Sequence, residues 1–262
     1  MRIETWIQHF ARNGENRPEP EWDAPPHPFA AHEKGTLLES VKQFQLGDGG
    51  GPAYLIGHDL ERYFAKNPQM QKLVDLWFHE EERHSELLGK AVKRLGGEPI
   101  TRHWSFSAFC GVRKLLGTRF ELYALLLTEI TSNNYYKLMR KYVSDTALVQ
   151  MSALIVRDET GHIAFHRDRI AGEMDGRYRL GTLWAAKMYC LALAAGTMLW
   201  VNHRKALVNR GATGREFYTG FLAETAHSIG TTRRRRLELC PAGRGAEIEV
   251  AHISGSPNAM RG

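Results

Sequence analysis

The sequence predicts an all-α protein, a bundle of helices with additions at both ends. From about residue 35 onward, apolar side chains recur at three- and four-residue spacing almost throughout the chain. No segment alternates apolar and polar residues as a half-buried strand would, and no repeat of fixed period occurs. Together these observations favour helices packed on helices over an architecture that contains a sheet.

The helices and their ends follow from local sequence signals. Residues 12–30 are rich in proline and polar residues and should form an extended N-terminal arm. The first helix should start near Thr36 and bend or break at the glycine-rich stretch 47–52, before it resumes through 53–66. Further helices are expected at about 69–95, 118–142, 146–173, 178–209 and 213–236. The sequence thus predicts one domain over 1–262, with a core bundle at about 36–172, added helices at about 178–236 and a flexible tail at about 240–262.

The composition is that of an ordinary globular protein. Hydrophobic residues make up 43% of the 262 residues and charged residues 24%, which is enough for one large core. The net charge is +6, but the basic residues are spread along the chain apart from one run that starts at Arg233, so we expect no nucleic-acid or membrane-surface partner. Cys110, Cys190 and Cys240 lie far apart without a CxxC pair, and the first twenty residues lack the apolar core of a signal peptide. A cytoplasmic location is therefore expected.

The most apolar stretch is "LWAAKMYCLALAAGTMLWV" at 183–201. It approaches membrane-spanning length, but it contains Lys187 and runs directly into polar and basic residues at 202–205. It is also the one stretch of its kind in the sequence. We therefore expect a buried helix of the bundle and not a membrane span.

Two Glu-x-x-His pairs carry the chemistry of the chain. Glu81 and His84 lie in "WFHEEERHSELL", and Glu159 and His162 lie in "RDETGH". Residues three apart share one helix face, so each pair can direct a carboxylate oxygen and an imidazole nitrogen at one point. Such mixed oxygen and nitrogen donors suit iron or manganese better than tetrahedral zinc.

Spacing alone is a weak signal, because Glu224 and His227 share it. That third pair has no matching acid, since no Asp or Glu occurs from 176 to 215, and we interpret it as surface or structural.

A pair of divalent ions needs more negative charge than two glutamates supply. Two such ions carry four positive charges, and an uncompensated charge is costly in a dry core. Glu129 lies in "YALLLTEITSNNYY" on the apolar face of its predicted helix, 30 residues before Glu159. Asp48 lies 33 residues before Glu81, a similar separation, and Glu39 is the substitute for it.

This arrangement resembles the ferritin-like di-iron carboxylate proteins, in which two helices each give one carboxylate and two others each give Glu-x-x-His. The resemblance covers roughly residues 36–172, and "RDETGH" is also similar to the Arg-Asp-Glu-x-x-His stretch of ribonucleotide reductase small subunits. It implies a ferritin-like four-helix bundle in which Asp158 is the hydrogen-bond partner of His84. The implied metal ligands are Asp48, Glu81, His84, Glu129, Glu159 and His162.

The resemblance does not extend to ribonucleotide reduction. Leu88 stands where reductase subunits typically have a radical tyrosine, and the chain lacks an obvious docking tail. It implies instead a non-haem oxidase or oxygenase with two iron ions, manganese or a mixed iron and manganese pair, which uses O₂ on a small organic substrate. Electrons would come from an external reductase or from the substrate, since no flavin or nicotinamide fingerprint is present, and the chain could act as a homodimer. The alternatives are a ferritin-like protein that stores metal or destroys peroxide, and a structural bundle.

Further side chains are expected at the O₂ pocket. Asn133 and Tyr136 follow Glu129 at helical spacing and could line the cavity. His166 lies one turn beyond His162, as a hydrogen-bonded core residue or as an extra ligand or proton donor. The predicted catalytic residues are Glu129, Asn133, Tyr136 and His166. In the acidic run at 80–82, only Glu81 has the required phase with His84, so Glu80 and Glu82 are expected on a solvated face, as is His79.

Overall fold

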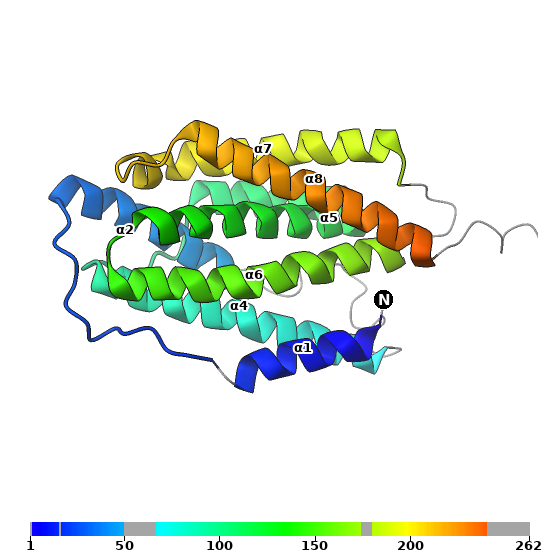
Figure 1. Cartoon of the computed structure of the whole chain (residues 1–262), viewed down its shortest axis with the longest axis horizontal. Coiled ribbons are helices and arrows are strands. Elements are labelled where there is room, and N and C mark those ends of the chain that lie inside the picture. The colour runs from blue at the N-terminus through cyan, green and yellow to red at the C-terminus, as the bar shows by residue number, and fades with distance from the viewer. Residues whose placement is uncertain (1, 16, 50–66, 174–179, 240–262) are drawn as a thin grey trace, which may run out of the picture.

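A computed structural model describes residues 2–15, 17–49, 67–173 and 180–239. These segments contain seven α-helices and no strand, which confirms the predicted all-α class. With the labels of Figure 1, the helices are α1 (Ile3–Glu15), α2 (Ala31–Gly49), α4 (Pro68–Arg94), α5 (Trp104–Tyr142), α6 (Thr146–Glu173), α7 (Thr182–Val208) and α8 (Gly214–Leu239). The predicted helical segment 53–66 and the predicted tail 240–262 lie outside the described residues.

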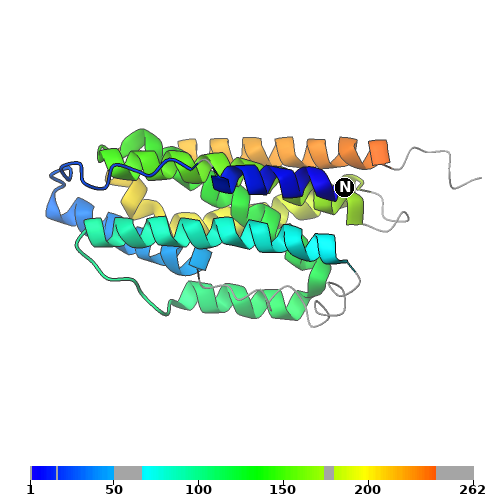
Figure 2. The same cartoon turned by 90° about the horizontal axis from the view of Figure 1, so that it is seen from below.

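Four long helices, α2, α4, α5 and α6, form the central bundle. The most extensive packing is between α5 and α6 and between α2 and α4 (Figures 1 and 2). One large apolar cluster contains Leu88, Tyr135 and Met151 and joins these four helices. Because apolar residues surround the middle of the bundle, any charged side chain that points inward there is removed from water.

Residues 17–30 of the predicted N-terminal arm contain no helix and one short turn at 22–24, which agrees with the prediction, whereas residues 12–15 are helical, which corrects it. Helix α1 reaches Glu15 and directs Trp6 and Phe10 at Phe165 of α6, with ring centroids 5.6 and 5.4 Å away. Apolar residues at positions 3, 6, 7 and 10 of the chain give this helix one apolar side, and α4 and α6 cover it. Helix α1 therefore closes one flank of the bundle (Figure 2).

Two other helices begin earlier than predicted. Helix α2 starts at Ala31, before Thr36, and α5 starts at Trp104, fourteen residues before 118. Gly111 lies within α5 without positive φ, so the helix accommodates this glycine. The end predicted near residue 95 for the second bundle helix is confirmed, because α4 ends at Arg94 and Gly96, which follows the C-cap residue Leu95, has φ 75°.

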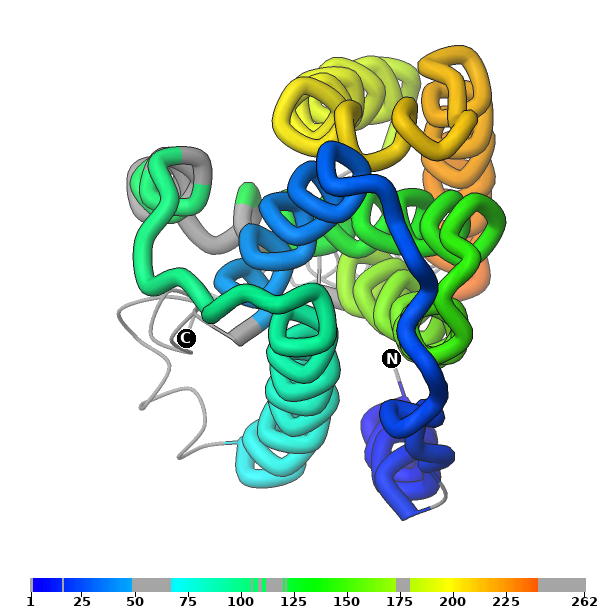
Figure 3. The backbone as a smooth tube through the Cα atoms, turned by 90° about the vertical axis from the view of Figure 1, so that its left-hand side faces the viewer, coloured from blue at the N-terminus to red at the C-terminus, as the bar shows by residue number. Residues whose placement is uncertain are grey.

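Helix α7 is an outer helix, so the expectation of a buried helix is wrong for most of its surface. Its length and composition would suffice to cross a membrane, the one such case among the described residues, and 22% of its most apolar window is buried. One side packs on the bundle and on α8, where Gly196 lies so close to Phe221 that a Cβ at position 196 would be 2.7 Å from the ring. Figure 3 shows α7 and α8 outside the central helices.

Candidate metal centre

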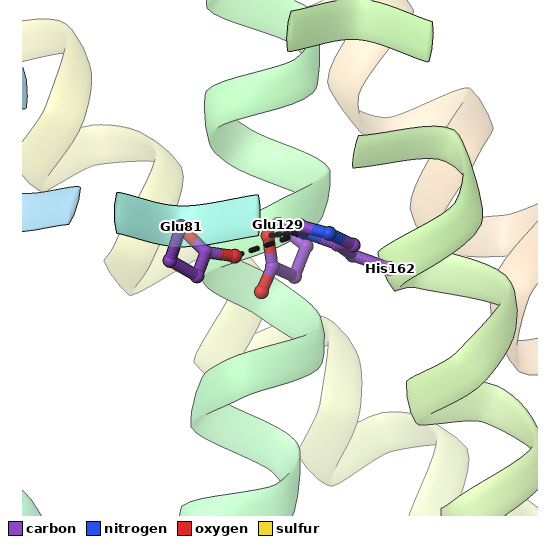
Figure 4. A group of neighbouring side chains, drawn as sticks. All are labelled: Glu81, Glu129 and His162. Atoms are coloured by element: carbon purple, nitrogen blue, oxygen red, sulfur yellow. Dashed lines mark ion pairs between the residues drawn. The ribbon is translucent and has the colours of Figure 1, made fainter. Parts of the chain in front are cut away.

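The predicted ligands come together from four helices inside the bundle. Figure 4 shows Glu81 of α4, Glu129 of α5 and His162 of α6, whose ligand atoms all lie within 4.8 Å of one another. The whole predicted set takes one side chain from α2, two from α4, one from α5 and two from α6: Asp48, Glu81, His84, Glu129, Glu159 and His162.

Both histidines present Nδ1 to the carboxylates. His162 Nδ1 lies 2.9 Å from Glu81 Oε1 and 3.6 Å from Glu129 Oε2. The same nitrogen lies 3.9 Å from Glu159 Oε2. His84 Nδ1 lies 3.8 Å from Glu81 Oε2 and 3.9 Å from Glu159 Oε1. Glu81 and Glu159 therefore each lie close to both imidazoles.

Asp48 joins the cluster from the end of α2. Its Oδ2 atom is buried and has no hydrogen-bond partner among the described residues. Burial, together with the negative charge of Glu81, raises the pKa of Asp48 to about 8. The substitute for Asp48, Glu39, points away from the cluster: its side chain is 65% exposed and it pairs with Lys42.

The outward nitrogen of each histidine is held by a second carboxylate. His84 Nε2 donates to Asp158 Oδ2 at 3.1 Å, which confirms the hydrogen bond that the resemblance implied. His162 Nε2 donates to Glu80 Oε2 at 2.9 Å. Since a neutral imidazole protonated at Nε2 has its lone pair on Nδ1, both contacts prepare the inward nitrogens to act as ligands.

Glu80 is buried, which corrects the expectation that it lies on a solvated face. Its relative exposure is 2%, because Trp77, Glu80, His84 and Leu87 follow one another at three- and four-residue spacing along the buried side of α4. That phase with Trp77 was the signal in the sequence. Glu82, by contrast, is exposed and faces His79, as predicted.

Asp158 is itself held by two arginines. Arg17 of the N-terminal arm pairs with Oδ2, and Arg157 contacts Oδ1 at 3.0 Å. Burial raises the pKa of Asp158, but His84 and the arginines outweigh this effect and lower it to about 2. Asp158 is therefore a stable anion in the folded protein.

Inward-facing polar atoms of the cluster lack hydrogen-bond partners in the part of the chain that the structure describes. They are Asp48 Oδ2, Glu81 Oε1, His84 Nδ1, Glu159 Oε2 and His162 Nδ1. A buried polar atom without a partner is costly, and several that converge on one volume require a common explanation. A pair of cations among them would satisfy all of these atoms, so the donor set fits the implied metals.

The ionisation of the cluster reflects its excess of acids. Burial and the neighbouring Glu129 carboxylate raise the pKa of Glu159 well above its usual value. Burial also raises the pKa of Glu129, but the neighbouring Glu159, His162 and His166 side chains outweigh this effect and hold that pKa well below its usual value. Burial lowers the pKa of His84, but Asp158 and other carboxylates raise it to about 9. In the metal-free protein, the protons held by Glu159 and His84 therefore offset part of the negative charge of the four carboxylates.

The predicted cavity residues lie beside the cluster. His166 Nε2 is 3.4 Å from Glu129 Oε1, and burial lowers the pKa of His166, so its ring is neutral. The Tyr136 hydroxyl is buried without a hydrogen-bond partner among the described residues, and burial together with Asp48 raises its pKa well above the usual value. Asn133 contacts Thr160 Oγ1 through its amide nitrogen at 3.3 Å. Their catalytic roles stay predictions.

The third Glu-x-x-His pair lies apart from this cluster, on α8. His227 is exposed, and Glu224 lies 4.0 Å from Arg167. This agrees with its interpretation as a surface or structural pair.

No protein-family model and no curated protein matches this sequence. Among solved structures, the chain is similar to three variants of an R2-like ligand-binding oxidase with aerobically reconstituted Mn/Fe cofactor. Identity is 14%, TM-scores are 0.54 to 0.55, and the matches cover 90% of this chain and 93 to 94% of the others. The chain therefore has the ferritin-like helical fold, as the sequence motifs predicted.

Proposed function

We propose that this chain is a di-metal carboxylate oxidase or oxygenase that acts on a small organic substrate. The observation that carries the proposal is the donor set: four carboxylates and two imidazoles converge inside the bundle, and an inward atom of three of the carboxylates and of both imidazoles has no hydrogen-bond partner among the described residues. The R2-like oxidase variants that share the fold carry an aerobically reconstituted Mn/Fe cofactor, which supports two iron ions or a mixed pair here.

The proposed ligands are Asp48, Glu81, His84, Glu129, Glu159 and His162. Four ionised carboxylates balance the four positive charges of two divalent ions, so loading would displace the protons that the acids share without metal. Asp158 and Glu80 keep the imidazole lone pairs inward, because each accepts the Nε2 proton of its histidine.

The bound metal pair would supply the redox chemistry, the reductive activation of O₂. The protein supplies the surroundings. Trp77 packs edge-on against His166 at 5.1 Å between ring centroids and helps to exclude water beside Glu129. Tyr136 presents a protonated hydroxyl to the cluster, and Asn133 leaves its Oδ1 without a partner among the described side chains, so both can orient a polar group of a substrate. An external reductase or the substrate would provide electrons.

The proposal is tested by loading the metal-free chain anaerobically with Fe(II), alone or with Mn(II), and then adding O₂. We expect two metal ions per chain and O₂ consumption with the appearance of a ferric absorption band. Glu81→Gln should abolish both, whereas Glu82→Gln, which changes the exposed neighbour in the same way, should retain them. Uptake of many irons per chain by a large assembly would support the storage alternative, and absence of stoichiometric binding would contradict both.

A further inference from the structure

The outward side of α7 is an apolar surface that nothing in the described chain covers. Nine large hydrophobic side chains are exposed in the described residues, and six of them lie on this one helix. We call the surface formed by them the α7 outer face: Leu183, Tyr189, Leu193, Met198, Val201 and Val208. Val201 is 59% exposed and Leu183 86%, whereas Trp184 and Met188 on the opposite side are buried. The helix therefore has a second apolar side besides the one that packs on the bundle.

A seventh exposed hydrophobic residue extends this surface. Trp104, at the start of α5, is 63% exposed and borders an open hollow of about 530 Å³ against α7, between Leu193 and Asn202. Two elements that lie far apart in the sequence thus contribute to one apolar surface. Tryptophan, with an apolar ring system and one polar N–H, is a residue typical of the boundary between water and lipid.

The charges on this surface have one sign. Lys187, Arg204 and Lys205 are exposed along α7, and no acidic residue occurs from 176 to 215. None of the three cations forms an ion pair within the part of the chain that the structure describes, and Lys187 instead lies 5.3 Å from the ring centre of Tyr123. The surface is therefore complementary to an apolar partner with negative charges at its border.

Although the spread of basic residues along the sequence predicts no membrane-surface partner, we propose that the α7 outer face docks this protein on the surface of membranes that contain anionic lipids. A helix with an apolar side and flanking cations lies in the plane of the membrane boundary, its apolar residues among the acyl chains and its cations at the headgroups. At 1.5 Å per residue, the 27 residues of α7 are about 40 Å long, so contact extends over many lipids. The other side of α7 stays packed on the bundle through Met188, Ala192 and Gly196.

A second copy of the chain fits this surface less well. In a two-fold symmetric contact the same surface serves both partners. If two copies of α7 pair antiparallel with the two-fold axis near Ala195, Lys187 of one copy lies near Arg204 of the other. If they pair parallel, each cation lies near the same residue of the other copy. In neither case does α7 offer an acid to offset the repulsion, whereas anionic headgroups would.

The test is co-sedimentation of the full-length protein with vesicles of phosphatidylcholine alone and of phosphatidylcholine with an equal amount of phosphatidylglycerol. We expect binding to the anionic vesicles and much weaker binding to the neutral ones, with a loss at high salt. The double variant Arg204→Glu and Lys205→Glu should weaken binding by about twentyfold or more, since each removed cation costs roughly fivefold. Val201→Asp, at an exposed position, should also weaken it.

The matched control is the double variant Lys72→Glu and Lys93→Glu, which makes the same charge change at exposed positions of α4, on the far side of the molecule from α7. It should bind as the unaltered protein does, and circular dichroism melts should show all variants folded. Equal losses in the α4 and α7 variants, or no binding to anionic vesicles, would overturn the proposal. A dimer in solution that Val201→Asp dissociates would also contradict it, because the surface would then be covered by a second copy.

Discussion

Glu80→Gln tests how the second carboxylates prepare the metal centre. Glu80 Oε2 accepts the Nε2 proton of His162 at 2.9 Å, and the two side chains are 3% and 0% exposed. Glutamine keeps the length of the side chain and an oxygen acceptor, but it removes the charge. The imidazole then becomes a weaker ligand, and its tautomer is less strongly fixed.

The size of the effect follows from this geometry. A hydrogen bond to a buried charged group contributes about 1.5–3 kcal/mol, and loss of such a partner typically lowers metal affinity about 10–100-fold. Because glutamine retains part of the contact, we expect about a tenfold loss of affinity, which corresponds to about 1.4 kcal/mol. Glu80→Leu, which retains none of it, should reach the upper part of this range.

The assay is competition of the protein with a chelator of known affinity for Fe(II) or Mn(II), with the free energy of unfolding of each metal-free variant measured by urea denaturation. Glu82→Gln is the control, since it neutralises an exposed glutamate on the same helix. If Glu80→Gln and Glu82→Gln bind metal equally well, the hydrogen bond from His162 to Glu80 has no role in the metal centre.

Three further predictions follow from the buried groups. Glu159→Gln should abolish metal binding and stabilise the metal-free protein above pH 4.5. The pKa of Glu159 is raised in the folded protein, so the folded protein loses stability relative to the unfolded chain as the pH rises above 4.5, and the neutral glutamine removes this loss. A urea midpoint at pH 7 that is equal to or lower than that of the unaltered protein would contradict this. Burial lowers the pKa of His203 to about 3, so between pH 6.5 and pH 3 only the unfolded chain takes up the proton. Because of this residue, acidification from pH 7 to pH 5 should lower the free energy of unfolding by about 2 kcal/mol. Urea denaturation of His203→Gln should not show this pH-dependent decrease. Gly196→Ala should destabilise the fold by about 1–3 kcal/mol because the added Cβ would meet the buried Phe221 ring. Gly89→Ala, which has open space around the added Cβ, should not destabilise it. Equal melting temperatures of the two variants would contradict the packing of α7 on Phe221.

Most of the helices, and the shared helix face of each Glu-x-x-His pair, could be predicted because both depend on local spacing. Glu81 with His84, and Glu159 with His162, share a helix face by geometry alone, whatever the helix packs against. Asp48 required an additional argument, charge balance, because its glycine-rich surroundings indicate a bend. That argument brought together residues that lie more than 30 positions apart in the sequence.

Features set by tertiary packing could not be predicted in the same way. Glu80 appears solvated in the sequence because it lies among other acids; its phase with Trp77 indicates the buried side of the helix, but its hydrogen-bond partner His162 lies 82 residues away and no local pattern reveals it. The contact between Arg17 and Asp158 joins the N-terminal arm to α6 across 141 positions, and no local pattern encodes it. Likewise the apolar composition of α7 does not reveal which of its sides the bundle covers, so a helix expected in the core lies outside it.

Anomalous diffraction at the iron and manganese absorption edges, from crystals of the metal-loaded protein, tests the proposed centre most directly. We predict two peaks enclosed by the predicted ligands, with Asp48 and His84 beside one or both. A single peak at Glu81, Glu129 and His162, or no peak in this volume, would contradict the di-metal assignment.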